Sequence, residues 1–141
     1  MGGENKNILM AEDNGDDVEL IKRKFKVRDI NCNLFVAKNG EEALDYMYHK
    51  KKYLDKEKFP DPDLILLDIR MPKINGIEVL KEIKSNEKLK DIPVVMLTVS
   101  TIEKDVLASF ENGCDHYVTK SVAFENFEKT LEPILKYYLL N

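Results

Sequence analysis

Short apolar runs alternate along the chain with longer segments in which apolar and polar residues recur at helical spacing. The short runs occupy residues 8–11, 34–37, 64–67, 94–97 and 117–119, each after polar or turn-type residues. A strand that is apolar throughout is buried on both faces, as in a parallel sheet covered by helices. The pattern therefore predicts five strands of one mostly parallel α/β sheet.

The segments between these runs carry apolar residues three and four positions apart, the period of an amphipathic helix. They predict helices around residues 18–25, 43–47, 79–83, 106–110 and 124–138. Gly113 is a plausible left-handed stop for the fourth helix, and Pro133 is expected to kink or restart the fifth. Residues 49–63, which are rich in lysine and contain two prolines, predict a long surface loop.

Length and composition predict a single domain spanning residues 1–141, with no linker and no separate output domain. Apolar residues make up 43% and charged residues 34% of the chain, and the net charge is −4. This balance disfavours direct DNA binding, and no apolar run is long enough to span a membrane. Cys32 and Cys114 lack metal-site spacing and are expected to be reduced thiols, which favours the cytoplasm.

Polar side chains follow four of the predicted strands. Glu12 and Asp13 follow the first strand, Asp68 the third, Thr98 the fourth and Lys120 the fifth. Ligands of open parallel sheets bind beyond the carboxyl ends of the strands, so these residues are expected to meet at one edge. Any one such Asp or Thr is more often a helix cap or turn residue, but capping alone does not explain the coincidence at four strand ends.

Three carboxylates at one edge repel each other, and a hard divalent cation with oxygen ligands neutralises such a cluster. Mg²⁺ is the natural candidate. Phosphoryl transfer requires a nucleophile, a metal ion and donors that neutralise the phosphoryl oxygens. Asp68 is the candidate nucleophile, Lys120 the fixed cation and Thr98 the hydroxyl donor.

Four segments around these strand ends stand out: Ile8-Leu9-Met10-Ala11-Glu12-Asp13-Asn14, Leu66-Leu67-Asp68-Ile69-Arg70-Met71-Pro72, Gly76 and Tyr117-Val118-Thr119-Lys120. In order and spacing they resemble the motifs of response-regulator receiver domains, and the resemblance covers essentially the whole chain. It implies a flavodoxin-like (βα)5 fold, a doubly wound five-stranded parallel sheet of order 2-1-3-4-5.

The resemblance also implies a function in a two-component phosphorelay. A sensor histidine kinase or a histidine phosphotransfer protein would present phosphohistidine, and Asp68 would take the phosphoryl group in a Mg²⁺-dependent step. Asp13 would bind the metal directly, Glu12 directly or through water, and Arg70 through its backbone carbonyl, with the Arg70 side chain left free. Such a protein is not an enzyme for other substrates but catalyses its own phosphorylation and dephosphorylation.

Receivers of this family usually switch through two residues, which here are Thr98 and Tyr117. The expected output surface is the fourth helix, fifth strand and fifth helix, which would bind an unknown downstream protein. The alternative is that Tyr117 is simply a half-buried strand aromatic.

Two positions depart from the family pattern. Val99 stands where a small residue is common, which is expected to narrow access to the phosphoryl site. Ser121 stands where proline is usual, often after a cis peptide bond. A cis bond before serine costs roughly 2.5–4 kcal/mol, so we expect a trans Lys120–Ser121 bond and a lysine aimed by rotation of its side chain.

The long loop, the acidic run of residues 12–17 and the lack of an output domain look most like stand-alone receivers that partner phytochrome-type and related sensor kinases. The aromatic and apolar tail, residues 137–140, is expected either to pack on the domain or to form a homodimer surface.

Three other functions compete with this interpretation. A flavin-binding protein would need a phosphate-cradling loop where the chain has an acidic run, and an aspartyl-phosphate phosphohydrolase would carry an acid where Arg70 stands. A degenerate receiver would bind partners without phosphorylation.

Overall fold

Five parallel strands form one sheet in the computed structural model, which describes residues 5–140. The strands are β1 (Lys6–Ala11), β2 (Cys32–Ala37), β3 (Leu64–Leu67), β4 (Val94–Thr98) and β5 (His116–Thr119). Their order is β2-β1-β3-β4-β5. The five predicted strands and the order implied by the resemblance are therefore confirmed.

The first two strands begin two residues earlier than predicted. Lys6 and Asn7 of β1 pair with Cys32 and Asn33 of β2, and Asn33 Nδ2 donates a hydrogen bond to Asn7 Oδ1 at 3.0 Å. Side-chain pairing of two polar residues thus extends the ladder beyond the apolar runs.

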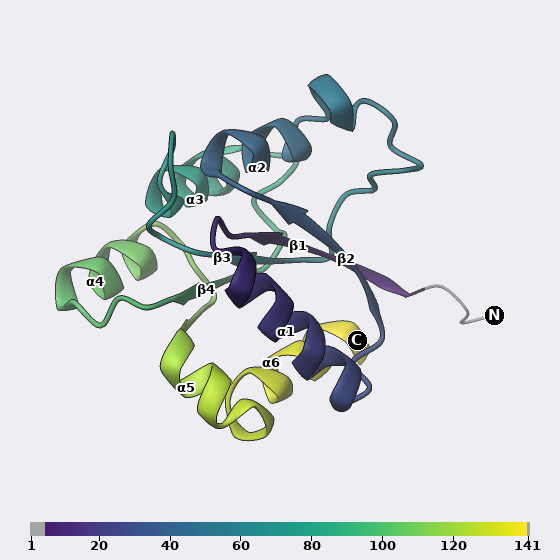
Figure 1. The fold of residues 1–141 in the computed structure, drawn as a ribbon. Coiled ribbons are helices and arrows are strands. Elements are labelled where there is room, and N and C mark those ends of the chain that lie inside the picture. Colours follow the sequence, from purple (N-terminus) through teal and green to yellow (C-terminus); the bar gives the residue numbers. More distant parts are fainter. Residues whose placement is uncertain (1–4, 141) are drawn as a thin grey trace.

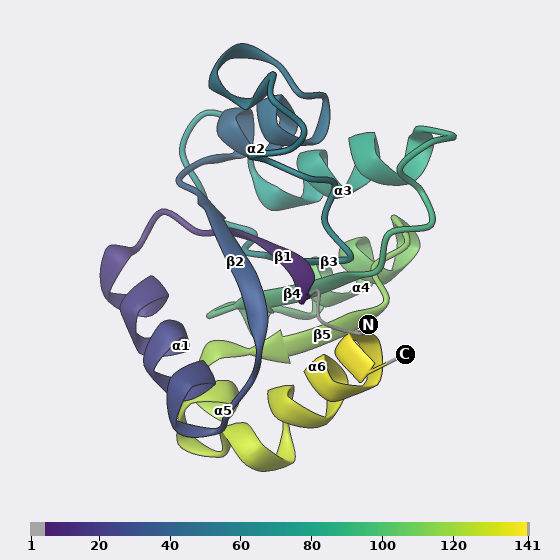
Figure 2. The same ribbon diagram turned by 90° about the vertical axis from the view of Figure 1, so that its right-hand side faces the viewer.

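Helices cover both faces of the sheet (Figures 1 and 2). One face carries α1 (Gly15–Val27), α5 (Lys120–Glu125) and α6 (Leu131–Leu140), and the other carries α2 (Gly40–Met47), α3 (Gly76–Ser85) and α4 (Glu103–Glu111). Successive strand residues point to opposite faces, so Ile8 and Met10 join the core under α1 while Leu9 and Ala11 join the core under α2 and α3. Burial on both faces explains why the strands are continuously apolar.

Asparagine side chains fix the starts of three helices close to the strand ends. Asn14, Asn39 and Asn75 cap α1, α2 and α3, each accepting a hydrogen bond from a backbone N–H in the first turn. Gly113 follows the C-terminal end of α4 and has a φ of 94°, which confirms it as a left-handed stop of that helix.

The predicted fifth helix is divided into three pieces, which corrects the expectation of a kink or restart at Pro133. After α5 the chain forms a 3₁₀ turn, η2 (Phe127–Lys129), and then α6. The breaks fall at Asn126 and Thr130, where Thr130 Oγ1 donates to the Asn126 carbonyl at 2.8 Å. Pro133 lies in the first turn of α6, where its missing N–H costs no helical hydrogen bond.

The segment from residue 49 to residue 63 is packed more tightly than the predicted surface loop. It contains a 3₁₀ turn, η1 (Lys51–Tyr53), and buries Tyr53. Tyr53 and Phe59 pack against Tyr46 of α2, with ring centroids 5.0 and 5.9 Å from the Tyr46 ring. Aromatic packing therefore anchors a segment whose lysines made it appear wholly solvated.

The C-terminal tail is divided between the two expected arrangements. Tyr138 and Leu139 pack against the core beneath α6, whereas Tyr137 and Leu140 are exposed. Within residues 5–140, no helix has the length and apolar character needed to cross a membrane.

Candidate functional site

The carboxyl edge of β1 and β3 holds two buried acids. Backbone pairing continues to this edge, because the Glu12 N–H donates to the Ala37 carbonyl at 2.9 Å and the Asp68 N–H donates to the Ala11 carbonyl at 3.1 Å. Glu12 is only 2% exposed and Asp68 only 4%. The sheet itself therefore fixes both carboxylates beside each other.

Asp13 completes an acidic cluster with these two residues. One carboxylate oxygen from each of Glu12, Asp13 and Asp68 lies within 4.8 Å of the others. Glu12 Oε2 accepts the Asn14 N–H at 3.2 Å, while the buried Glu12 Oε1 faces the Lys120 ammonium group at 2.8 Å. A hard divalent cation fits such a set of oxygen ligands and would neutralise their negative charge.

Burial dominates the electrostatics of Glu12. It raises the pKa of Glu12 well above the ordinary value, and the negative charge of Asp68 raises it further, while Lys120 opposes both effects. A bound cation would favour the ionised form of the cluster.

Lys120 is buried at the start of α5, and its ammonium group faces the acidic cluster. Nζ lies 3.1 Å from Asp68 Oδ2, 2.7 Å from Asp17 Oδ2 and 2.8 Å from Glu12 Oε1. The contact with Glu12 is an ion pair between two buried side chains. Burial lowers the pKa of Lys120, but the contacts with Asp17 and Glu12 and the charge of Asp68 outweigh it and leave that pKa above its ordinary value.

The two oxygens of Asp68 have different surroundings. Oδ1 accepts the Ile69 N–H at 2.7 Å, and Oδ2 faces Lys120. Behind them the start of α3 comes so close that a Cβ on Gly76 would overlap the Asp68 carbonyl oxygen. A glycine is therefore required at this position, and its N–H donates to the Ile69 carbonyl at 2.7 Å, which joins α3 to the loop.

Thr98 is fully buried at the end of β4, the strand beside β3. Its hydroxyl oxygen accepts the Ser100 N–H at 3.4 Å, which holds the side chain at the edge of the site. Val99 is 68% exposed, so its side chain lies at the surface.

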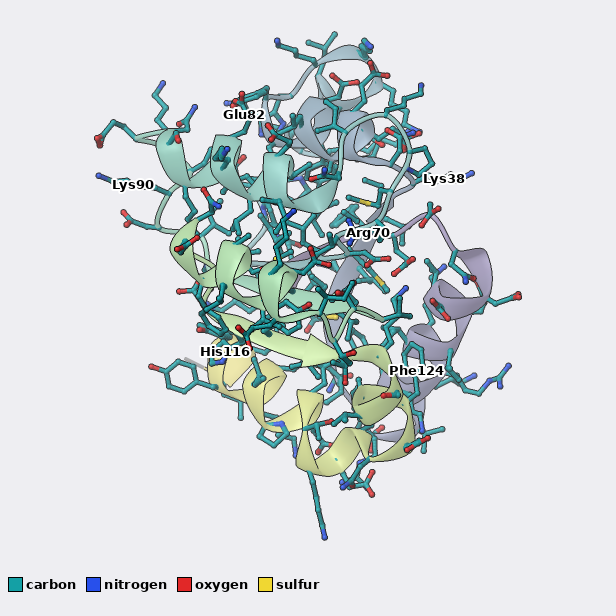
Figure 3. The ribbon with its side chains drawn as sticks, turned by 90° about the vertical axis from the view of Figure 1, so that its left-hand side faces the viewer. Lys38, Arg70, Glu82, Lys90, His116 and Phe124 are labelled. Carbon is teal, nitrogen blue, oxygen red and sulfur yellow. The ribbon has the colours of Figure 1, made fainter. Side chains whose placement is uncertain are left out.

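Arg70 and Tyr117 make contacts that the sequence did not predict. The Arg70 side chain is not free as expected, because Nη2 donates to Asp105 Oδ2 at 2.7 Å. Figure 3 shows Arg70 beside α3 and α4. The Tyr117 hydroxyl donates to the Ser100 carbonyl at 2.9 Å, and burial raises the pKa of Tyr117.

Sequence reasoning missed Asp17 and Asp105. Asp17 belongs to the acidic run and stands four residues after Asp13, so the sequence offered a signal that it could lie near the cluster. No sequence pattern pointed to Asp105. The two histidines lie outside the cluster, with His49 bonded to Asp61 and His116 to Tyr138 (Figure 3 labels His116). The Lys120–Ser121 bond is trans, which confirms that prediction.

This fold and this edge of the sheet define a doubly wound α/β domain with a carboxylate cluster and a buried lysine, the arrangement of a phosphoacceptor. The sequence profile of the response regulator receiver domain matches residues 8–132, and the chain belongs to that family. It is thus a phosphoacceptor component of two-component signalling.

Several relatives resemble the chain over almost its full length. Response regulator Rcp1 of Synechocystis sp. is 40% identical over 95% of this chain and 89% of Rcp1, and the probable methanogenesis regulatory protein FilR2 of Methanothrix harundinacea is 36% identical over 94% and 83%. The Mn²⁺-bound form of Rcp1 superposes with a TM-score of 0.83, covering 95% of this chain and 94% of that one. The phosphorylated cyanobacterial phytochrome response regulator RcpA, 34% identical, superposes with a TM-score of 0.84 at the same coverage. The similarity to phytochrome response regulators agrees with the subgroup that the sequence indicated.

Proposed function

We propose that Asp68 takes a phosphoryl group from the phosphohistidine of a sensor histidine kinase or histidine phosphotransfer protein in a Mg²⁺-dependent step. The observation that carries this proposal is the buried Asp68 carboxylate, which lies 3.1 Å from the Lys120 ammonium group and shares a metal-sized cluster with Glu12 and Asp13. In the transfer, the N–P bond of phosphohistidine breaks and an O–P bond to Asp68 forms. The electron pair of the broken bond stays on the histidine nitrogen.

Asp13, Asp68 and Glu12 would hold the Mg²⁺ ion, with the Arg70 backbone carbonyl as a further ligand. When bound, the ion neutralises the carboxylates and the charge that develops on the phosphoryl oxygens. The proposal is supported by the three clustered carboxylates and by the relative Rcp1, which has been solved in an Mn²⁺-bound form.

The chain's own donors orient the reacting groups. Ile69 holds Asp68 Oδ1 through its N–H, Lys120 places a positive charge beside Oδ2, and Thr98 supplies a hydroxyl group on the neighbouring strand. Preorganised donors of this kind stabilise charge as it develops, so the domain would catalyse its own phosphorylation and dephosphorylation.

Phosphorylation is proposed to act through Thr98 and Tyr117. A phosphoryl group on Asp68 would attract the Thr98 hydroxyl away from the Ser100 N–H, and Tyr117 would leave the Ser100 carbonyl and turn inward. The proposed output surface is α4, β5 and α5. Its apolar side chains Ile102, Leu107, Phe110 and Val122 are 44–57% exposed and would contact a downstream protein.

The cellular setting belongs to the same proposal. The likeness to RcpA supports a phytochrome-type or related sensor kinase as the phosphodonor. The unpaired Cys32 and Cys114 support a reducing cytoplasm, and the exposed Tyr137 and Leu140 support a homodimer contact. Residues 1–141 would act as one receiver domain that signals through its own surface and not through DNA.

Incubation with acetyl phosphate and Mg²⁺, followed by intact mass measurement, tests the proposal. The wild type is expected to gain one hydroxylamine-labile phosphoryl group, Asp68→Asn none, and the control Asp16→Asn as much as wild type. Uptake in Asp68→Asn would overturn the assignment of the acceptor. No uptake in wild type would instead favour a receiver that binds partners without phosphorylation.

A further inference from the structure

We propose that Asp17 is a positioning residue that holds the Lys120 ammonium group in place for phosphoryl transfer. The inference rests on the proposed function, because it assigns a task within the same site. Of the three carboxylates around Lys120 Nζ, Asp17 is the nearest, with Oδ2 at 2.7 Å.

Asp17 occupies a rigid position at the start of α1. Asn14 caps this helix, and its Oδ1 accepts the N–H groups of Asp16 and Asp17 at 2.9 and 3.2 Å. The backbone that carries Asp17 is thus fixed directly beside the acidic cluster. A carboxylate on so short a side chain is a well-defined anchor for a long, flexible lysine.

The helix dipole does not account for the direction of the Asp17 side chain. An acidic residue in the first turn stabilises a helix whichever way it points, and Asp16 fills that role with an exposed side chain. The Asp17 side chain is only 19% exposed and is hydrogen-bonded to Lys120. The hydrogen bond from Lys120 therefore explains the orientation of the Asp17 side chain.

The carboxylates divide into two groups with different tasks. Among the described residues, the group able to share one metal ion consists of Glu12, Asp13 and Asp68. An ion bound there would weaken the attraction of Glu12 and Asp68 for Lys120, since their charge would be neutralised. Asp17 stands outside that group and remains the anionic partner of the lysine.

A separate anionic partner matters because Lys120 must exchange its contact with Asp68 for one with the phosphoryl group while its ammonium group stays in position. An ammonium group has three donors, so one can stay on Asp17 while another passes from Asp68 Oδ2 to a phosphoryl oxygen. Without Asp17, the four-carbon side chain is free to rotate, and fewer lysine conformers face the reacting group.

The test compares Asp17→Ala with Asp16→Ala, which removes the same charge from the same helical turn but no contact of Lys120. Initial rates of phosphorylation by acetyl phosphate are measured at saturating Mg²⁺, and the Mg²⁺ midpoint is measured separately by thermal shift. We expect Asp17→Ala to lower the rate about tenfold with a Mg²⁺ midpoint within about twofold of wild type, and Asp16→Ala to change neither. A rate for Asp17→Ala within about threefold of wild type would overturn the inference while leaving the proposed function intact.

A double-mutant cycle tests whether Asp17 acts through the lysine. In a Lys120→Ala background, adding Asp17→Ala is expected to change the rate by less than about twofold. A further large loss there would show that Asp17 affects the rate without the lysine, against the inference. If Asp17→Ala does not fold, Asp17→Asn, which keeps the shape but not the charge, takes its place under the same criteria.

A measurement without phosphodonor separates this inference from the proposed function. The ¹⁵N-coupled ammonium signal of Lys120 is expected in spectra of wild type and Asp16→Ala, since the group is buried and held, and to broaden or vanish in Asp17→Ala. An unchanged signal in Asp17→Ala would contradict the positioning role. Absence of phosphoryl uptake by wild type would contradict the proposed function alone.

Discussion

Arg70 and Asp105 join the loop after Asp68 to helix α4, with Arg70 Nη2 only 2.7 Å from Asp105 Oδ2. The same Asp105 oxygen accepts the Ser100 hydroxyl at 2.6 Å, and the Ser100 carbonyl accepts the Tyr117 hydroxyl at 2.9 Å. One connected set of hydrogen bonds thus runs from beside the acceptor to α4 and β5. It provides a physical link between the site and the proposed output surface.

Arg70→Ala is expected to loosen α4. The Arg70 side chain is 59% exposed, so losing this ion pair should lower the free energy of unfolding by only about 0.5–1 kcal/mol. Hydrogen exchange in the first turn of α4 should nevertheless rise several-fold, because its anchor to the loop is gone. Lys73→Ala is the control, since Lys73 pairs with Glu41 of α2. Equal exchange in α4 of both variants would argue against the link.

Mg²⁺ should stabilise the unphosphorylated protein by mass action. At a Mg²⁺ concentration ten times the dissociation constant, the gain in unfolding free energy is about 1.4 kcal/mol. Asp13→Ala removes one of the three clustered ligands and should lose most of the shift in melting temperature, whereas Asp16→Ala should keep it. A wild type whose melting temperature does not respond to millimolar Mg²⁺ would contradict metal binding at this cluster.

Asp68→Asn should be at least as stable as wild type when no metal is present. The amide oxygen can still accept the Ile69 N–H, and Lys120 keeps Asp17 and Glu12 as partners. Loss of repulsion within the carboxylate cluster should raise the free energy of unfolding by about 1 kcal/mol or less. A lower urea midpoint in the variant would contradict this prediction and would mean that the lost ion pair with Lys120 outweighs the relief of repulsion.

Glu132 should make the free energy of unfolding decrease as the pH falls into the acidic range. A hydrogen bond from Arg28, which has the larger effect, and one from Lys136 lower the pKa of Glu132 from 4.5 to about 2. Because the folded pKa is depressed, the stabilisation is present above pH 4.5 and is lost as the pH falls toward about 2. Urea unfolding of wild type and Glu132→Gln should therefore differ at pH 6 and converge toward pH 2, whereas the exposed Glu125→Gln should follow wild type throughout. A constant gap between wild type and Glu132→Gln would refute the assignment.

The sequence predicted those parts of the site that depend on strand ends. Glu12, Asp13, Asp68 and Lys120 come together because the carboxyl ends of parallel strands share one edge, so their positions follow from topology alone. The contacts of Asp17 and Arg70 depend instead on side-chain rotamers. Arg70 and Asp105 are 35 residues apart, and no periodic pattern connects them.

The interruption of the last predicted helix could not be inferred from the sequence for a different reason. Phe127 of η2 and Leu131 of α6 are both buried, so the apolar spacing continues across the break. The local competitor is the Thr130 hydroxyl, which donates to a backbone carbonyl. Periodicity reports which residues face the core and is insensitive to such a local interruption.

Locating the phosphoryl group tests most directly whether Asp68 is the acceptor. After phosphorylation with acetyl phosphate and Mg²⁺, borohydride reduces an aspartyl phosphate to homoserine, and peptide mass spectrometry identifies the converted residue. We expect conversion at Asp68 alone, dependent on Mg²⁺ and absent when phosphodonor is omitted. Conversion at Asp13 or another carboxylate, with Asp68 unchanged, would contradict this expectation.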